Sequence, residues 1–343
     1  MNPPHFADCQ PAIQQIVHLL HGIELPERFP HCLLRRVFRS KSDLSLAVSL
    51  VFAIFLWGGN NAGTRFIVGT WPPIWTGGTR FASAGLILLA VLRFTNWLGT
   101  LRPVSRELSR RLWLNGGLSL AVYIVCFNWA LRFTSASHVA LYLGASPVWA
   151  LLWEGRPAKS WLTLQRYGAA LLALTGVVVL FWPTLKSSGG HWIGEALGII
   201  ASVLWTQYGR QCRALGTHLT GVEVSAHTMW RAGLMLLAVG IFEVIRGGLV
   251  WRTDIVLIQI YCIIAGGVVA FAIWSHALRR WPTSKVLLFN NLIPLSTTTW
   301  AYFCLNEPLT VTFWIAMVLI IVGVILGQTN WQKLLQPTAV PPE

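Results

Sequence analysis

Charged residues are scarce in this sequence. Aspartate, glutamate, lysine and arginine make up 11% of its 343 residues, and only 12 residues are acidic. An average soluble domain has about 25% charged residues, whereas here the hydrophobic share is 55% and the mean hydropathy is +0.58. This composition excludes an ordinary soluble protein and indicates a chain that lies in a lipid bilayer, with no room for a soluble catalytic domain.

Motifs for several kinds of chemistry are absent as well. The six cysteines form neither a CxxC pair nor a cysteine and histidine pattern with metal-ligand spacing, so we expect no metal site and no disulfide framework. No GxxxxGK[ST] phosphate loop occurs, so direct coupling to ATP is unsupported. The HxxxD and HExxH motifs of a membrane-embedded enzyme are missing too. We therefore expect no cofactor and no enzymatic activity.

Long apolar runs, separated by short polar breaks, recur from residue 44 to residue 328. A transmembrane helix needs roughly 20 mostly apolar residues, and this spacing predicts an all-α membrane protein with about ten such helices. The expected spans are residues 44–66, 74–92, 112–131, 135–153, 164–182, 194–212, 222–245, 255–278, 283–303 and 311–329.

Basic residues give the chain a net charge of +14, but they stand between the apolar runs. In a membrane protein such charges mark the cytoplasmic side, so they indicate topology and not a nucleic-acid partner. With the N-terminus inside, 19 of the 26 lysines and arginines lie on the inner side and 5 on the outer side, while Arg80 and Arg231 fall within spans. We expect both termini in the cytoplasm, residues 1–43 and 331–343 as tails, and a cell membrane location such as a bacterial inner membrane.

The sequence contains an internal repeat. A shift of 147 residues aligns residues 130–177 with 277–324 and gives 14 identities in 48 positions, where composition alone gives roughly 4. Upstream, residues 85–91 match residues 233–239 at a shift of 148. The predicted halves are residues 44–182 and 194–330, with five spans each. Because five is odd, the second half is expected to lie upside down relative to the first, a construction that lets transporters open a midplane site to either side.

These residues resemble the drug/metabolite transporter superfamily, specifically its ten-span EamA type. The likeness covers about residues 44–330 and rests on Trp57-Gly58-Gly59-Asn60, Arg80-Phe81, Ala130-Leu131, Ser137, Pro147, Leu204-Trp205, Ala277-Leu278, Pro294, Asn306-Glu307-Pro308 and Gly323-Val324. It implies export of amino acids or related metabolites. The family usually has a glutamate after both span 4 and span 9. Glu307 fills the second place, but its repeat counterpart is Ser160 and the nearest acid is Glu154, which argues against a symmetric role for two acids.

Polar groups inside spans are costly in hydrocarbon, so they tend to face the bundle interior or a wet cavity. The candidate substrate-binding residues are Asn60, Asn61, Arg80, Tyr123, His138, Tyr142, Trp205, Tyr208, His227, Arg231, Asn290 and Asn291. Arg80 either binds a substrate carboxylate through two hydrogen bonds or snorkels to the outer headgroups. One helical face of span 4 either lines a cavity or packs; it carries His138, Tyr142, Ser146, Trp149 and Trp153.

Two further features concern the transport cycle. Pro147 and Pro294 stand at repeat-related positions and are expected to kink spans 4 and 9, which makes them candidate gates. Proton coupling needs a titratable group in the path. Four carboxylates fall near predicted span ends: Glu154, Glu195, Glu243 and Glu307. That leaves three histidines as weak candidates, His138, His227 and His276, and coupling stays open.

Together these features predict a secondary transporter that exports amino acids or related small metabolites by alternating access. Its expected partners are a small-molecule substrate and the lipid bilayer, with a homodimer left open. Two other classes also stay open: a membrane-embedded enzyme, and a sensor or subunit with a transporter fold and no flux.

Overall fold

The computed structural model describes residues 41–153, 161–186, 192–280, 289 and 292–328. All regular structure in these residues is helical, which confirms the predicted all-α class. Of the two predicted tails only residues 41–43 are described, and they belong to the first described helix. The candidates Asn290 and Asn291 lie outside the described residues.

The helices follow the predicted spans closely. The first half contains α3 (Lys41–Val68), α4 (Pro73–Phe94), α5 (Arg106–Arg111), η2 (Leu112–Gly117), α6 (Leu118–Phe133), α7 (Ala136–Gly144), α8 (Ser146–Trp153) and α9 (Trp161–Lys186). The second half contains α10 (Trp192–Leu215), α11 (Gly221–Gly247), α12 (Thr253–Tyr261), η3 (Cys262–Val269), α13 (Ala270–Arg280), α15 (Ile293–Leu305) and α16 (Val311–Gln328). η2 and η3 are π-helical turns inside spans 3 and 8, which both continue as one helix.

The outer surface of the bundle is apolar. Within the described residues, five helical stretches are long and apolar enough, by length and composition, to cross a membrane: Leu44–Val68, Pro73–Phe94, Arg106–Phe133, Gly221–Gly247 and Thr253–Trp274. Large apolar side chains such as Phe52, Leu86, Val122 and Leu257 are exposed along them. Exposed side chains of this kind are suited to lipid as the surrounding solvent.

Local chemistry fixes where several helices begin. Pro73 opens α4, because its fixed φ and missing N–H suit a first turn. At α7 the Ser135 Oγ accepts a hydrogen bond from the His138 N–H at 3.1 Å. Thr220 and Glu223 form a reciprocal capping box at the start of α11.

Span 4 is interrupted at Ala145. α7 ends just before this residue and α8 begins just after it, one residue ahead of Pro147. A proline disfavours the α conformation in the residue before it, so the break falls where the sequence predicted one. Pro294, its repeat counterpart, lies in the first turn of α15 and not in the interior of that helix. The predicted kink of span 9 therefore takes the form of a helix start.

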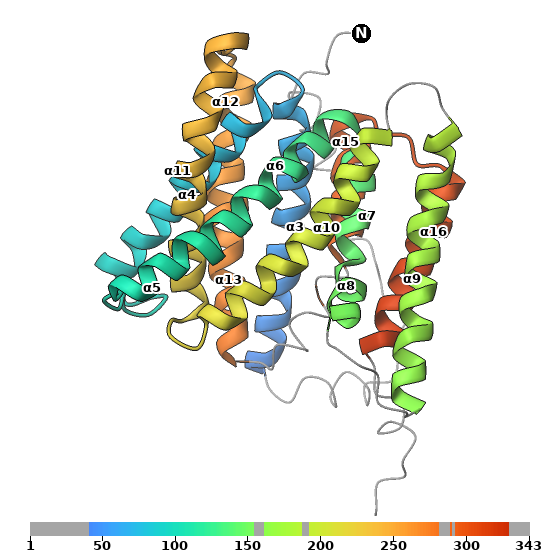
Figure 1. Cartoon of the computed structure of the whole chain (residues 1–343), viewed down its shortest axis with the longest axis horizontal. Coiled ribbons are helices and arrows are strands. Elements are labelled where there is room, and N and C mark those ends of the chain that lie inside the picture. The colour runs from blue at the N-terminus through green and yellow to red at the C-terminus, as the bar shows by residue number, and fades with distance from the viewer. Residues whose placement is uncertain (1–40, 154–160, 187–191, 281–288, 290–291, 329–343) are drawn as a thin grey trace, which may run out of the picture.

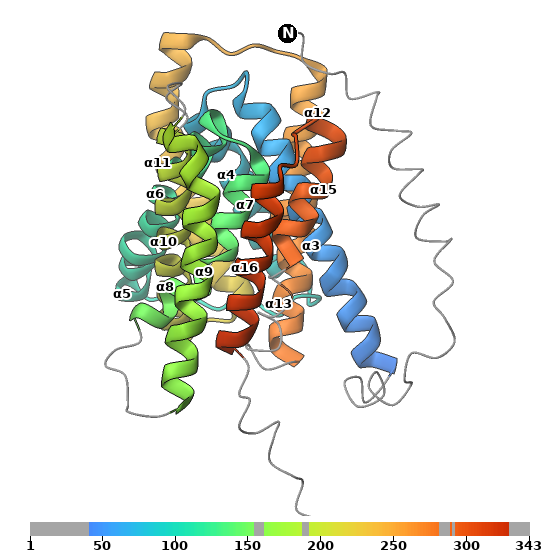
Figure 2. The same ribbon diagram turned by 90° about the vertical axis from the view of Figure 1, so that its right-hand side faces the viewer.

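Helices related by the sequence repeat pack in related ways. α4 packs along α11 and α9 along α16; the second pair stands at one edge of the bundle (Figure 1) and faces the viewer when the molecule is turned (Figure 2). α10 packs on α6 and α7, while α3 packs on α13 and α15. In terms of spans, span 6 contacts spans 3 and 4, and span 1 contacts spans 8 and 9. The contacts of one half are thus repeated in the other.

Small residues allow α4 and α11 to approach closely at their crossing. A Cβ added to Gly85 would lie 2.3 Å from the Trp230 backbone N, and one added to Gly233 would lie 2.2 Å from the Ala82 backbone N. Gly85 and Gly233 are 148 positions apart (233 − 85), and so are their contact residues, Ala82 and Trp230 (230 − 82). Because lower-numbered residues of one helix meet higher-numbered residues of the other, α4 and α11 run antiparallel.

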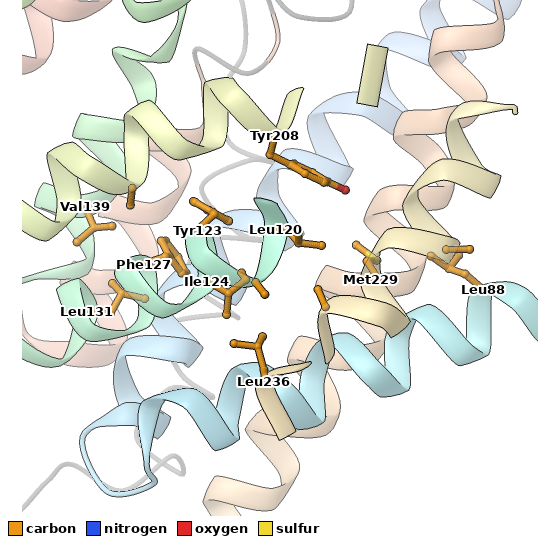
Figure 3. Packing of buried hydrophobic residues seen from close by; sticks show 14 of the residues in the cluster. Leu88, Leu120, Tyr123, Ile124, Phe127, Leu131, Val139, Tyr208, Met229 and Leu236 are labelled. Atoms are coloured by element: carbon orange, nitrogen blue, oxygen red, sulfur yellow. The ribbon is translucent and has the colours of Figure 1, made fainter. Parts of the chain in front are cut away.

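The largest buried apolar cluster lies between the halves. It joins Leu88 of α4, Ile124 and Phe127 of α6, Tyr208 of α10 and Leu236 of α11 (Figure 3). Since both halves contribute side chains to this core, it forms a common scaffold for the polar clusters around it.

Candidate functional site

Arg80 of α4 is buried against α3. Its Nη1 donates to the Thr64 Oγ1 at 2.5 Å and to the Asn60 Oδ1 at 3.4 Å, and its Cζ lies 4.6 Å from the Phe81 ring centroid. The Arg80 residue is 3% exposed, which rules out snorkelling to the headgroups in this conformation. Its Nε has no partner, and no salt bridge reaches it within the described part of the chain.

A small cavity of about 40 Å³ lies beside this guanidinium. Its lining includes Trp57, Asn60, Phe81, Cys262 and Phe271. A water needs roughly 10–15 Å³ of such space, so the cavity has room for a few waters in this conformation. Aromatic rings and one amide therefore surround the one charged group.

The two adjacent asparagines of span 1 form hydrogen bonds with different helices. Asn60 accepts from Arg80, while the Asn61 Nδ2 donates to the Thr297 Oγ1 of α15 at 3.0 Å. In span 3, the Asn128 Nδ2 donates to the Pro73 carbonyl at 2.7 Å, which ties α6 to the start of α4. Only Asn60 of these three contacts Arg80.

A second buried arginine lies on α11. The Arg231 Nη1 donates to the His227 carbonyl at 3.0 Å and lies 3.1 Å from the His227 Nδ1, and Nη2 donates to the Ser109 Oγ at 3.2 Å. Because a guanidinium only donates, the His227 Nδ1 must accept, which assigns the proton of the neutral ring to Nε2. That Nε2, the Arg231 Nε and the Trp230 Nε1 are buried donors without a partner in the described structure.

The predicted aromatic residues of spans 3 and 6 form one stack. The ring centroids of Tyr123 and Trp205 are 5.1 Å apart, and those of Trp205 and Tyr208 are 5.6 Å apart. The Tyr208 hydroxyl lies 2.9 Å from the Thr228 Oγ1 of α11. Figure 3 shows Tyr123 and Tyr208 within the central core, so their rings serve packing as much as a site. Tyr123 also lies within electrostatic reach of Arg80.

The predicted polar face of span 4 turns toward α10. The Glu195 carboxylate of α10 accepts from the Thr134 Oγ1 at 2.5 Å, the His138 Nδ1 at 2.8 Å and the Tyr142 hydroxyl at 2.5 Å. Glu195 is 2% exposed. It lies near a span end, as the sequence predicted, but three side chains bury it between α7 and α10.

Further along the same interface the contacts are neutral. The Trp149 Nε1 donates to the Ser202 Oγ at 2.9 Å, and the Ser202 Oγ donates to the Tyr142 carbonyl at 2.6 Å. At the far end, the Arg210 Cζ lies 5.2 Å from the Trp153 ring centroid. Every residue of the predicted face thus meets α10, and we call these contacts the α7/α8–α10 interface.

Two other carboxylates cap helices of their neighbours. Glu307 accepts from the backbone N–H of Ala136 at 2.7 Å and from that of Ser137 at 3.1 Å, at the start of α7. Glu243 accepts from the backbone N–H of Ile74 at 2.8 Å, at the start of α4. A carboxylate stabilises a helix N-terminus in this way, so the position of Glu307 has a structural explanation here.

Pro294, one of the two predicted gates, lies near the end of α7. A Cβ added to Gly144, at the end of α7, would lie 2.9 Å from the Pro294 Cγ at the start of α15. The break beside Pro147 and the helix start at Pro294 therefore belong to one contact. His276, the remaining histidine candidate, lies on α13.

These features define the class: an all-helical, multi-pass membrane protein with buried cations between its two halves. Its sequence matches the EamA-like transporter family over residues 44–182 and 192–327. The chain belongs to that family of membrane transporters.

Several proteins of similar sequence are named as transporters. An uncharacterized transporter of Archaeoglobus fulgidus is 24% identical, covering 78% of this chain and 90% of its own. The uncharacterized transporter YyaM of Bacillus subtilis is 24% identical over 80% of this chain and 90% of its own, and the uncharacterized inner membrane transporter YedA of Escherichia coli is 23% identical over 80% and 88%. One crystal structure matches with a TM-score of 0.56 at 20% identity, covering 87% of this chain and 100% of the other, which shows the fold alone.

Proposed function

We propose that this chain is a secondary transporter of ten transmembrane helices in two inverted halves, which exports amino acids or related small metabolites by alternating access. Antiparallel packing of repeat-related helices supports the inversion. α4 and α11 are antiparallel, and so are α9 and α16, where Gly176 meets Ala316 and Gly323 meets Ala169. Halves of equal orientation would leave counterpart helices parallel, so antiparallel counterparts favour an inverted repeat.

The charge distribution supports a topology with both termini in the cytoplasm, in a bacterial inner membrane. Nineteen lysines and arginines then lie inside and five outside. Under this topology α7 and α10 begin at the outer side. A periplasm-active reporter fused after Lys333 is expected to be inactive; activity there would reverse the topology.

The buried guanidinium of Arg80 is the observation that supports a substrate with a carboxylate. A buried guanidinium without an acid is costly, and the Arg80 Nε has no partner in the described structure. A substrate carboxylate supplies the missing acceptor and accepts from the guanidinium fork through both oxygens. Since the adjacent cavity of about 40 Å³ is too small for an amino acid, α3, α4 and α13 must separate to admit a substrate, which is the motion that alternating access requires.

Arg231 supports a path along the α4–α11 crossing. The antiparallel register places Arg231 opposite Ala84, four residues beyond Arg80 on α4, or about 6 Å along the helix axis. The unpartnered donors around Arg231 are all N–H groups, which also suits a ligand that only accepts. A carboxylate released from Arg80 would meet Arg231 on its way through the crossing.

Counterflow in proteoliposomes tests the proposal. Purified full-length protein is reconstituted, and uptake of radiolabelled amino acids, nucleosides and amphipathic drugs is measured against unlabelled solute inside, with protein-free vesicles as the control. We expect exchange of amino acids above that control. Exchange of nucleosides or drugs alone would contradict the substrate class, and no exchange of any solute would favour a sensor or subunit without flux.

A further inference from the structure

We propose that Glu195 and His138 form the proton-binding site of the transport cycle, so that export is coupled to proton uptake from the outer side. This inference rests on the proposed transport function. It begins from the partners of Glu195: one carboxylate oxygen accepts from His138 and Thr134, and the other from Tyr142. The basic partner of Glu195 is therefore a histidine, a type of side chain that can gain and lose a proton near physiological pH.

Another glutamate of the same molecule provides a contrast. Glu223 is paired with Arg102, whose Nε and Nη2 lie 3.1 Å and 2.8 Å from its Oε2. Arginine keeps its charge at all physiological pH values, so the Glu223 pair is permanently ionic. A carboxylate and a histidine that bond to each other can instead gain and lose a proton together, and Glu195 has such a partner in His138.

The two side chains differ in their access to the surface. The His138 side chain is 25% exposed, whereas that of Glu195 is 2% exposed. His138 thus lies between the buried carboxylate and the surface at the end of the bundle where α7 and α10 begin. Because its Nδ1 faces Glu195, the Nε2 is the nitrogen left to exchange a proton. The ring stacks on Phe313 of α16 at 6.3 Å between centroids, which fixes its orientation.

The net charge of the pair changes by one when a proton binds. With neutral His138 and ionised Glu195 the pair carries −1; with one proton added, on either residue, it carries zero. Glu195 lies in the first turn of α10 and His138 in the first turn of α7, where both helix N-termini stabilise an anion. Proton uptake removes the net charge of the pair and so changes its interaction with both helix N-termini, which shifts the conformational equilibrium.

The other charged side chains near this pair have their own partners. Glu307 accepts from the backbone of α7, the Arg132 guanidinium donates to the Val68 carbonyl, and the Arg65 Nη1 donates to the Arg132 carbonyl at 3.2 Å. Tyr142 is the remaining titratable group in contact with Glu195. Among described side chains, none of the three charged groups bonds to Glu195 or His138, so proton uptake by the pair does not involve them.

The repeat-related interface shows that packing does not need the pair. Leu204-Trp205 aligns with Leu56-Trp57 at a shift of 148, which makes Ala47 the counterpart of Glu195, and a shift of 147 makes Phe289 the counterpart of Tyr142. Ala47 and Phe289 pack in one apolar cluster with Leu50. In the described part of this interface, apolar residues stand in place of Glu195 and Tyr142, so the acid at Glu195 indicates a role other than packing.

Transport driven by a pH gradient tests the proposal. Full-length protein in proteoliposomes is assayed for exchange of radiolabelled L-leucine and, separately, for net L-leucine movement under an imposed pH gradient. In the wild type we expect the gradient to drive net movement. Glu195→Gln is expected to keep exchange and lose the gradient-driven component entirely. The matched control is Glu243→Gln, a capping carboxylate without a histidine partner, which should behave as the wild type.

Two outcomes overturn the proposal: wild-type exchange with no response to the gradient, or gradient-driven movement that survives in Glu195→Gln. If Glu195→Gln fails to fold, the double variant Glu195→Ala with Tyr142→Phe, which copies the residues of the other interface, replaces it and is judged in the same way.

A titration separates failure of this proposal from failure of the transport function. Should the wild type exchange no amino acid, the proposed substrate class is wrong, and ¹⁵N-histidine NMR of the full chain then decides on the proton site. The His138 resonance, identified by its loss in His138→Gln, is expected to respond to pH differently in the wild type and in Glu195→Gln. A His138 ring that keeps one charge state, or titrates identically in both proteins, overturns the proton site.

Discussion

The α7/α8–α10 interface and its counterpart between α3 and span 9 share a packing pattern but differ in chemistry. In the first, Glu195 is buried under His138 and Tyr142. In the second, Ala47 and Phe289 occupy the corresponding positions and lie in an apolar cluster. The counterpart of His138 is Lys285, which lies outside the described residues.

Further along, the second interface relies on neutral groups. The Trp300 Nε1 donates to the Phe55 carbonyl at 3.1 Å, and Asn61 donates to Thr297 at 3.0 Å. The two halves thus keep a common backbone arrangement with side chains of different polarity. A transporter needs similar halves to exchange conformations, but only one interface needs to respond to a proton.

The largest expected effect comes from removing the histidine alone. His138→Ala leaves the Glu195 charge buried without its cationic partner, and we expect the free energy of unfolding to fall by about 3 kcal/mol. Denaturant unfolding in micelles measures this. In the double variant His138→Ala with Glu195→Ala, most of the loss should be recovered, because no charge is then left unpaired. Simple addition of the two single effects would show that the residues do not interact.

Exchanging tyrosine and phenylalanine between the interfaces should have a smaller effect. Tyr142→Phe removes a hydrogen bond to a carboxylate and is expected to lower the free energy of unfolding by about 2 kcal/mol. The reciprocal change, Phe289→Tyr, adds a hydroxyl to an apolar cluster, so it should not stabilise the protein. If Tyr142→Phe proved neutral in the same unfolding assay, the phenol would contribute nothing to holding Glu195.

The smallest effect is expected at Ser202. Its hydroxyl accepts from Trp149 and donates to the Tyr142 carbonyl, so Ser202→Ala leaves one buried donor unpaired, at a cost of about 1 kcal/mol. Thr299→Ala on α15, whose hydroxyl bonds only within its own helix, is the matched control and should change stability less. Equal effects of the two substitutions would mean that the neutral part of the interface adds no specific stability.

The architecture was predictable because periodic apolar runs and the repeat act over long stretches of sequence. The break of span 4 was also predictable, since Pro147 restricts its neighbours whatever the tertiary structure. The site was predictable only in part. Arg80 was found because a cation within an apolar run is costly wherever it lies. That Asn60 and not Asn61 would contact it depends on the rotation of α3, which the sequence does not fix.

Glu195 shows the limit of reasoning from position along a span. A carboxylate in the first turn of a helix normally reaches water, and no pattern in the sequence predicted that Thr134, His138 and Tyr142 would enclose it. A signal was nevertheless present in α10. Glu195, Ser202, Thr206 and Arg210 follow one another at helical spacing, so α10 carries a polar face that matches the polar face of span 4. Comparing the two faces would have paired the helices.

The most direct test of the account compares L-leucine with L-leucinol, which has the same side chain and amino group but no carboxylate. Counterflow of both is measured in proteoliposomes with the wild type and with Arg80→Lys, a variant that keeps the positive charge but not the bidentate geometry. The account predicts that Arg80→Lys inserts and folds normally, loses most L-leucine exchange and leaves L-leucinol less affected. Wild-type rates of L-leucine exchange in Arg80→Lys, or failure of that variant to reach the membrane, would contradict a role for Arg80 in recognising the carboxylate.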